Sequence, residues 1–317
     1  MRKALIVGVD FYQHVSPLNG CANDAHAVKG ILERHGDGSP NFGVQLVVAN
    51  GESSKIDRKF LKDRVTQLFS EDSDIALFYF SGHGHLESTG GYLLTSECTE
   101  GDDGLSMDEL LVIANNSNAK NKVIVLDCCH SGATGSPATS DSKALLSEGV
   151  TILTASGANQ YSLESDGAGV FTSLFVDALS GSAANLVGDI TPGSVYAHID
   201  QSLGPWDQRP IFKTNVKRFV SLREVPPPIS LEELRRIVEL FPEPGYNFPL
   251  DPSYEPTEAE TTPQNAETFS LLQKYNHINL VRPVDEDHMY YAALNSRSCK
   301  LTVLGAHYWR LVKKGRI

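Results

Sequence analysis

Two short segments of this chain place reactive side chains directly after runs of apolar residues. The run Val123–Leu126 is followed by Asp127, Cys128, Cys129 and His130. The run Ile75–Phe80 is followed by Ser81, Gly82 and His83. A buried strand that ends in a polar turn delivers its last side chains to the edge of a sheet. A thiol and an imidazole at the ends of two strands can act as a nucleophile and its proton carrier.

The elements that must position these residues alternate between strand and helix over the first two-thirds of the chain. Strands are predicted at 4–10, 45–49, 75–80, 122–128, 151–155 and 217–221. Helices are predicted at 21–35, 56–70, 106–116, 170–181 and 192–203. This order indicates an α/β domain with a mostly parallel sheet, in which ligands bind outside the carboxyl ends of the strands. Asp10, His83 and Cys129 all fall at such ends.

The segments Phe80–Gly84 and Asp127–Gly132 resemble the two catalytic motifs of the caspase and metacaspase peptidase family, on its bacterial, metacaspase-like side. His83 and Cys129 are 46 residues apart, close to the spacing of about 50 that is typical of caspases. Three supporting segments are Gly20–Ala25, Gly169–Thr172 and Gln208–Ile211. The resemblance covers residues 1–221. It implies a caspase-like three-layer sandwich around a mostly parallel six-stranded sheet.

The resemblance selects Cys129 as the nucleophile, because the family places its thiol directly before His-Ser-Gly. Side chains alternate along a strand, so Cys128 should face the other way as a small buried hydrophobe. Neighbouring cysteines without a Cys-x-x-Cys pair argue against zinc. His83 is the expected general base and acid, whereas His85 and His130 are expected to be structural. The resemblance implies that the backbone N–H groups of Gly84 and Cys129 stabilise the oxyanion.

An acidic pocket is the next implication of the resemblance. In metacaspases an acidic pair receives a basic residue just before the scissile bond, and the matching residues here are Asp24 and Asp127. Carboxylates pair well with guanidinium and ammonium groups. The alternative is that Asp24 caps a helix and Asp127 orients local backbone. Ser156, Gln160 and Glu164 follow the fifth strand, where the family closes the pocket wall.

Two further expectations concern processing and metal binding. Lys143 lies in a Gly-, Ser- and Ala-rich stretch after the nucleophile and suits self-cleavage after a basic residue; a plain loop is the alternative. The acidic turn with Asp102 and Asp103 could hold calcium, as metacaspases often require, although it lacks EF-hand spacing. A solvated turn is the commoner explanation. The thiol chemistry itself needs no cofactor.

Composition limits the class of protein. The chain has 317 residues, 41% hydrophobic and 21% charged, which is ordinary for a globular protein. No apolar run reaches the roughly 18 residues of a membrane span, and the N-terminal segment is read as a strand rather than a signal peptide. Five cysteines without framework spacing argue for reduced thiols and a cytoplasmic location. The net charge of −12 argues against general nucleic-acid binding by the whole chain.

The last third of the chain changes in composition. Residues 222–265 are acidic and rich in proline, and we expect a linker with one short helix that starts after Ser230. Residues 266–317 are expected to form a small, mainly helical interaction domain that loosely resembles winged-helix domains. Residues 264–317 hold eight Lys/Arg and four Asp/Glu. This unit could bind a protein partner.

Together these features predict a cysteine endopeptidase that cleaves after Arg or Lys. Analogy with the family suggests a role in bacterial stress, defence or programmed cell death. Two alternatives remain open at this stage. One is a catalytically silent caspase-like scaffold that works by binding. The other is a protease recruited to nucleic acid through residues 266–317.

Overall fold

The computed structural model describes residues 1–128, 145–155, 164–165, 168–204 and 209–317. The chain forms two compact units. Unit 1 comprises Met1–Asn185 and Asp189–Val225, and unit 2 comprises Leu186–Gly188 and Pro226–Ile317. The motifs with reactive side chains belong to unit 1. Each unit is described by itself below.

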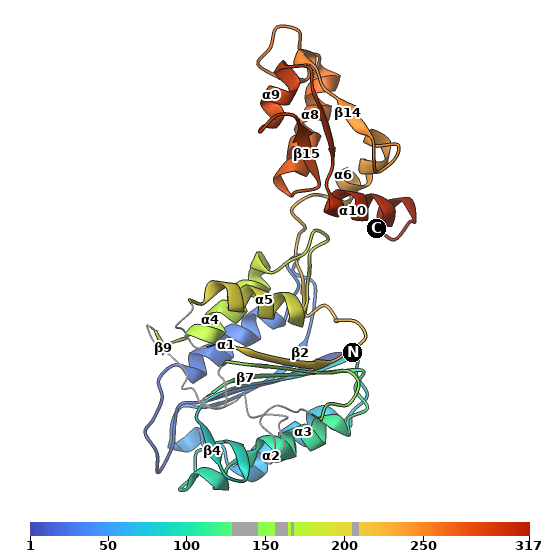
Figure 1. Cartoon of the computed structure of the whole chain (residues 1–317). Coiled ribbons are helices and arrows are strands. Elements are labelled where there is room, and N and C mark those ends of the chain that lie inside the picture. Colours follow the sequence, from blue (N-terminus) through green and yellow to red (C-terminus); the bar gives the residue numbers. More distant parts are fainter. Residues whose placement is uncertain (129–144, 156–163, 166–167, 205–208) are drawn as a thin grey trace. The chain divides into compact units, whose positions relative to one another are not determined.

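Unit 1 is built around a six-stranded sheet with the order β12-β8-β7-β3-β1-β2 (Figure 1). Its strands are β1 (Arg2–Val9), β2 (Gly43–Ala49), β3 (Ile75–Ser81), β7 (Asn121–Asp127), β8 (Val150–Thr154) and β12 (Ile211–Asn215). All neighbouring strands are parallel except β12, which runs antiparallel to β8. The predicted mostly parallel, six-stranded sheet is therefore confirmed.

Helices cover both faces of this sheet, as Figure 1 shows. On one face lie α1 (Cys21–Leu32), α4 (Val170–Asp177) and α5 (Pro192–Ser202), with a π-helical turn at Ala178–Ser182 after α4. On the other face lie α2 (Arg58–Ser70) and α3 (Met107–Asn115). The result is the expected three-layer sandwich with one apolar core on each side of the sheet.

The central strands form because their apolar runs are buried on both faces. All seven residues of β3 are buried. Along β3, Phe78 and Phe80 pack in the core with α2 and α3, whereas Leu77 and Tyr79 pack in the core with α1 and α4. Burial of each such side chain contributes about 1.5–3 kcal/mol of transfer free energy. This alternation fixes which side chains reach each face when the strand ends.

The last strand of the sheet lies upstream of its predicted position. The expectation of a strand at 217–221 was wrong, because the strand is β12 at Ile211–Asn215. β12 is an edge strand whose residues are half-buried or exposed. An edge strand needs apolar residues on one side only, so its sequence signal is weaker than that of a buried strand.

Short strands complete unit 1. The loop after β3 forms a small antiparallel sheet of β4 (Gly84–Glu87), β5 (Gly90–Leu93) and β6 (Leu105–Ser106). Two further antiparallel pairs are β9 (Glu164–Ser165) with β10 (Ala168–Gly169), and β11 (Asp189–Ile190) with β13 (Arg223–Glu224). Single 3-10 turns lie at Glu52–Ser54 and Gly101–Asp103. The first of these small sheets continues directly from His83.

Unit 2 combines helices with a three-stranded antiparallel sheet of order β14-β16-β15. Its helices are α6 (Leu231–Arg235), α7 (Ile237–Leu240), α8 (Pro263–His277), α9 (Met289–Leu294) and α10 (Val303–Lys313), with a 3-10 turn at Pro252–Tyr254. Its strands are β14 (Asn247–Pro249), β15 (Val281–Val284) and β16 (Ser298–Leu301). The sequence analysis predicted a mainly helical unit and did not predict this sheet.

The proline-rich segment differs from the extended linker expected at 242–265. It contributes β14 to the sheet of unit 2, and Leu250 is buried in the same core as Phe269 and Leu272. Phe241, just before it, is fully buried, and its carbonyl accepts a hydrogen bond from the Trp309 indole N–H at 2.6 Å. Prolines exclude helix but allow edge strands and turns, so composition alone does not separate these from a linker.

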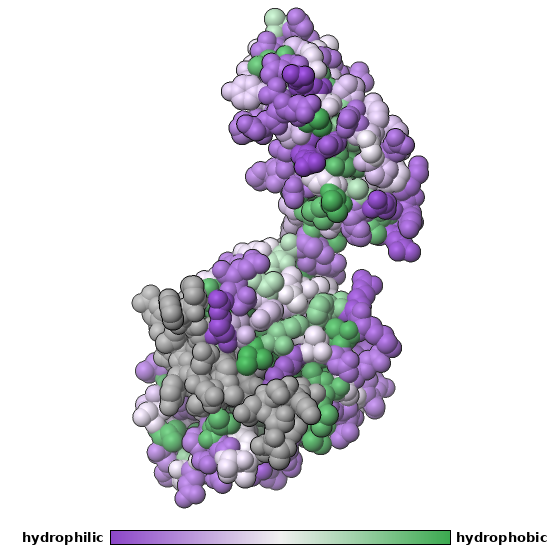
Figure 2. All heavy atoms as spheres, viewed as in Figure 1, coloured by the Kyte–Doolittle hydropathy of each residue, from purple (hydrophilic) through white to green (hydrophobic). Residues whose placement is uncertain are grey.

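The surface of unit 2 is mostly hydrophilic on the face visible in Figure 2, with some hydrophobic side chains among the polar ones. Large exposed hydrophobic residues include Val303, which is 89% exposed, and also Leu304, Tyr290 and Tyr291. In the described part of the chain, no helix is long and apolar enough to cross a membrane.

Truncation of Phe241 tests whether the proline-rich segment is part of the folded unit. Phe241→Ala should destabilise unit 2 by about 3–5 kcal/mol, because it leaves a cavity in a closed core. Val303→Ala, at an exposed position of the same unit, should change stability by less than about 0.5 kcal/mol. Amide hydrogen exchange of unit 2 in the full chain measures both. Equal protection in the two variants would show that Phe241 lies outside the core.

Candidate active site

The two motif segments leave the sheet side by side. β3 and β7 are parallel neighbours, and the last paired residues are Ser81 and Asp127. The Gly82 N–H donates to the Asp127 carbonyl oxygen at 3.3 Å, so backbone contact continues one residue past the strands. In the sequence, His83 and Cys129 each lie two residues beyond this last pair. Cys129 is outside the described residues, but both segments depart from matching positions at one edge of the sheet.

His83 is held from two sides by the loop between β1 and α1. The Tyr12 phenol oxygen accepts a hydrogen bond from the His83 backbone N–H at 2.8 Å, and the two rings lie 4.7 Å apart between centroids. On the other side, His83 Nε2 lies 2.8 Å from the Ser16 carbonyl oxygen. A carbonyl only accepts, so Nε2 carries the hydrogen. In the neutral ring Nδ1 then has the free lone pair, which suits it to take a proton.

His85 lies in a different setting from His83. Its Nε2 is 2.8 Å from Glu87 Oε1, and both side chains are exposed. A Cβ atom on Gly101 would fall 1.7 Å from the His85 ring, so the imidazole packs against that glycine. His85 thus belongs to the β4–β5 hairpin, in which Gly84 pairs with Leu93.

The two predicted pocket carboxylates converge. Asp24 is 4% exposed and Asp127 is 6% exposed. A Cβ atom on Gly169 would lie 2.5 Å from Asp127 Oδ2 and 3.1 Å from Asp24 Oδ2. Both carboxylates therefore border the same point, and only glycine fits beside them. Two buried carboxylates that face one point repel each other, and a bound cation would relieve that repulsion.

Hydrogen bonds fix the orientation of each carboxylate. Asp24 accepts from the Ser81 hydroxyl at 3.2 Å and from the Gly169 N–H at 3.2 Å. Asp127 accepts from the Thr172 hydroxyl at 2.7 Å. Since Thr172 donates its only hydroxyl hydrogen to Asp127, the Tyr79 hydroxyl donates to Thr172 in turn. Asp24 is one turn into α1, so helix capping does not explain its contacts with Ser81 and Gly169.

The sequence analysis did not assign three residues that contact the site: Thr172, Tyr79 and Tyr12. Thr172 ends the Gly169–Thr172 segment, which entered the sequence analysis only as support for the family resemblance. Tyr79 occurs within an apolar strand, where it reads as an ordinary core residue. Tyr12 carries no local signal beyond its place two residues after Asp10. Each acts through contacts between segments far apart in the sequence, from 45 to 93 residues.

Cys128 is confirmed as a buried hydrophobe. It is fully buried in the core on the α2 and α3 side, together with Ile124 and Leu126, whereas Val123 and Val125 face the other core. Cys129, His130, Lys143, Ser156 and Gln160, and the side chain of Glu164, lie outside the described residues. Their predicted roles stay predictions.

The acidic turn uses its carboxylate internally. Asp103 Oδ2 accepts from the Thr99 N–H at 2.6 Å, from the Thr99 hydroxyl at 2.9 Å and from the Glu100 N–H at 3.2 Å. Asp102 is exposed. Among the residues the structure describes, no group of three or more His, Cys, Asp or Glu side chains could hold a metal ion. The contacts of Asp103 thus give the turn a structural explanation.

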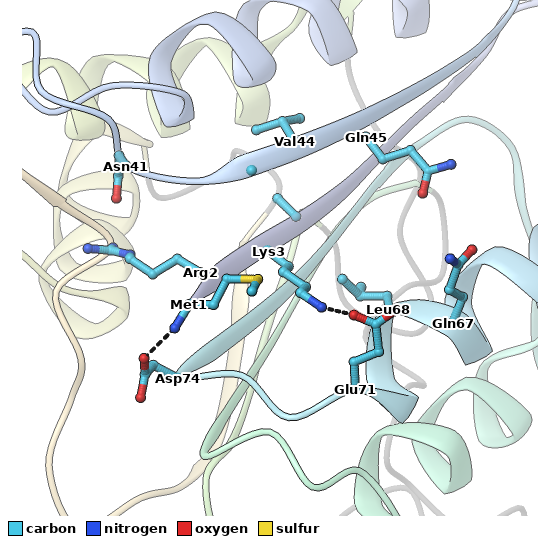
Figure 3. Close-up of a pocket in the computed structure, with 12 residues that line it drawn as sticks. Met1, Arg2, Lys3, Asn41, Val44, Gln45, Gln67, Leu68, Glu71 and Asp74 are labelled. Atoms are coloured by element: carbon cyan, nitrogen blue, oxygen red, sulfur yellow. Dashed lines mark hydrogen bonds and ion pairs between the residues drawn. The ribbon is translucent and has the colours of Figure 1, made fainter.

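A large hollow occurs elsewhere in unit 1. It has a volume of about 830 Å³ and is lined by the first residues of β1 and β2 together with Gln67, Leu68 and Glu71 of the α2 end (Figure 3). An ion pair between Lys3 and Glu71 crosses it (Figure 3). These are the amino ends of the strands, opposite the edge that carries His83. The hollow is therefore separate from the motif residues.

Comparison with known proteins identifies the family of unit 1. The sequence pattern of the family described as "Caspase domain" matches residues 1–220. The chain is 31% identical to Metacaspase-1 of Plasmodium falciparum over 153 residues, which cover 42% of this chain and 24% of that protein. It is 26% identical to Metacaspase-6 of Arabidopsis thaliana over 149 residues, which cover 41% of this chain and 38% of that protein.

The alignments span less than two-fifths of the length of these curated relatives. Among solved structures, Caspase-1 from Spodoptera frugiperda has a TM-score of 0.50 at 16% identity, and covers 71% of this chain and 90% of its own. A protein from Geobacter sulfurreducens has a TM-score of 0.53 at 17% identity, and covers 71% of this chain and 100% of its own. At such identities these structures show the fold alone.

The four described cysteines should be poor nucleophiles. Burial raises the pKa of Cys98 to about 11 and of Cys299 to about 12, and it raises the pKa of Cys21 as well. A thiol with a pKa near 11 is thiolate in about one molecule in ten thousand at pH 7.

Iodoacetamide at pH 7 should therefore leave Cys21, Cys98, Cys128 and Cys299 unmodified in the native chain, whereas urea should expose all of them. Peptide mapping by mass spectrometry checks this. Native labelling of Cys21 or Cys98 as fast as in urea would contradict the burial.

Proposed function

Because this chain belongs to the caspase-domain family of cysteine peptidases, we propose that it is a cysteine endopeptidase with Cys129 as nucleophile and His83 as general base and acid. The observation that carries the proposal is the common departure point of the two motif segments at Ser81 and Asp127. The orientation of the His83 ring supports it, since Ser16 occupies Nε2 and leaves Nδ1 to exchange protons.

The proposed reaction has two halves. His83 takes the proton of the Cys129 thiol, and the thiolate attacks the carbonyl carbon of the scissile bond. The resulting oxyanion is stabilised by the backbone N–H groups of Gly84 and Cys129. His83 then protonates the leaving amine, which gives an acyl-enzyme. A water molecule, deprotonated by His83, releases the acid and restores the thiol.

We further propose that the residue before the scissile bond is Arg or Lys. The convergence of Asp24 and Asp127 beside Gly169 supports this preference, because a guanidinium or ammonium group would offset the charge of both carboxylates. Ser156 is proposed to line the same pocket, and Lys143 is proposed as a site of self-cleavage. The contacts of Asp103 do not support calcium dependence, because its carboxylate accepts hydrogen bonds within its own turn.

Unit 2 is proposed to recruit a protein partner. It has a core of its own, and its exposed Val303 and Leu304 begin α10, which ends near Lys313, Lys314 and Arg316. A reducing, cytoplasmic location is proposed from the sparse cysteines, since Cys21, Cys98 and Cys299 form no disulfide bond. The role in bacterial stress, defence or programmed death rests on analogy with the family.

A peptide panel tests the nucleophile, the base and the specificity together. Fluorogenic peptides with Arg, Lys or Asp before the reporter should be turned over only after Arg or Lys. Cys129→Ala should abolish turnover, and His83→Ala should lower kcat by at least about a hundredfold. His85→Ala, in the neighbouring hairpin, should leave kcat within about threefold. Preferred cleavage after Asp, or full activity of Cys129→Ala, would refute the proposal.

Mass spectrometry of wild type and Lys143→Ala shows whether the chain is cut after Lys143.

Neutralising one pocket carboxylate tests the acidic pocket. Asp127→Asn should lower kcat/KM for Arg peptides by about thirtyfold or more, because a buried charge pair loses one partner. Gly169→Ala should act in the same direction, since its Cβ would displace Asp127. Asp102→Asn removes an exposed carboxylate from the acidic turn and serves as the control. Equal kcat/KM values in Asp127→Asn, Asp24→Asn and the control would disprove the pocket.

A further inference from the structure

Tyr12 lies in the loop between β1 and α1 and is only 5% exposed. It belongs to the core on the α2 and α3 side of the sheet, the same core that contains Phe80 and Cys128. A buried tyrosine needs a partner for its hydroxyl group. The partner here is the His83 backbone: the Tyr12 hydroxyl oxygen accepts a hydrogen bond from the His83 N–H at 2.8 Å.

Tyr12 makes a second contact with the imidazole itself. The two rings are 4.7 Å apart between centroids and inclined by 51°. A Cβ atom on Gly82 would lie 2.7 Å from the Tyr12 hydroxyl oxygen, so the close approach requires glycine at that position. Tyr12 therefore contacts both the backbone and the side chain of the proposed base.

The loop that carries Tyr12 is firmly anchored. The Asp10 carboxylate accepts from the N–H groups of Cys21 at 2.8 Å and Ala22 at 3.2 Å, at the start of α1. The Gln13 N–H donates to the Ser96 carbonyl oxygen at 2.8 Å. The same loop supplies the Ser16 carbonyl oxygen that meets His83 Nε2. A fixed loop can thus hold the ring between Tyr12 and Ser16.

We infer that Tyr12 is a positioning residue for the reaction, and that its hydroxyl group fixes the His83 backbone so that Nε2 stays on Ser16 and Nδ1 stays free for the thiol proton. The inference rests on the proposed function of His83. Because Tyr12 is buried, we expect it to act through His83 and not by contact with the substrate. Loss of its hydroxyl group should change proton transfer and leave substrate binding intact.

Tyr12→Phe is the direct test, because it removes the hydroxyl group and keeps the ring. We expect kcat on an Arg peptide to fall about tenfold, with KM unchanged within about twofold. The acid limb of the kcat/KM pH profile should shift, since the environment of His83 changes. Tyr275→Phe is the matched control: it removes the hydroxyl group of another buried tyrosine, which donates to the Glu233 carbonyl oxygen in unit 2. Its kcat and pH profile should match wild type.

A nitrogen NMR spectrum of the histidine rings gives a readout that does not depend on activity. In wild type, His83 should show the single Nε2–H tautomer, and in Tyr12→Phe this signature should become mixed. Unchanged kcat together with an unchanged His83 tautomer would overturn the inference. If no peptide is turned over by wild type but the tautomer still changes in Tyr12→Phe, the positioning role stands and the proposed peptidase function fails.

Discussion

The parallel pairing of β3 with β7 is the constraint on which the rest of unit 1 depends. Its register ends at Ser81 and Asp127, and each proposed catalytic residue follows two positions later in the sequence. A shift of one residue would move every side chain of a strand to the opposite face. Asp127 would then face the α2 side, which Leu126 and Cys128 face now, away from Asp24. The apolar content of both faces therefore fixes the geometry of the polar edge.

The acidic pair of Asp24 and Asp127 carries an electrostatic cost. Two nearly buried carboxylates are unfavourable unless donors or a cation satisfy them. The structure supplies neutral donors: Ser81, the Gly169 N–H and Thr172. None of these three donors brings a positive charge. Neutral donors orient a carboxylate without cancelling its charge, so a cationic ligand would still be attracted to the pair.

How far the sequence predicted this molecule depends on the range of each interaction. The buried strands β1, β3, β7 and β8 follow from continuous apolar runs, and Asp24 and Asp127 follow from family motifs. Edge strand β12 and the small strands of unit 2 were misplaced or missed, because half-buried strands alternate weakly and prolines resemble a linker. The contacts of Tyr12 with His83 and of Thr172 with Asp127 join distant segments. No local pattern encodes such pairs, so only the folded chain shows them.

The loop between β1 and α1 contacts both parts of the proposed site: the base His83 and the helix that carries Asp24. Asp10 directly follows β1 and accepts two N–H groups at the start of α1, where a negative charge is favourable. That helix carries Asp24 in its first turn, while the loop it follows carries Tyr12 and Ser16, which hold His83. The carboxylate of the proposed specificity pocket thus lies in the helix that directly follows the loop holding the proposed base. α1 is bonded to the loop whose Tyr12 and Ser16 contact His83. The contacts of Asp10 therefore help to position Asp24 and His83 together.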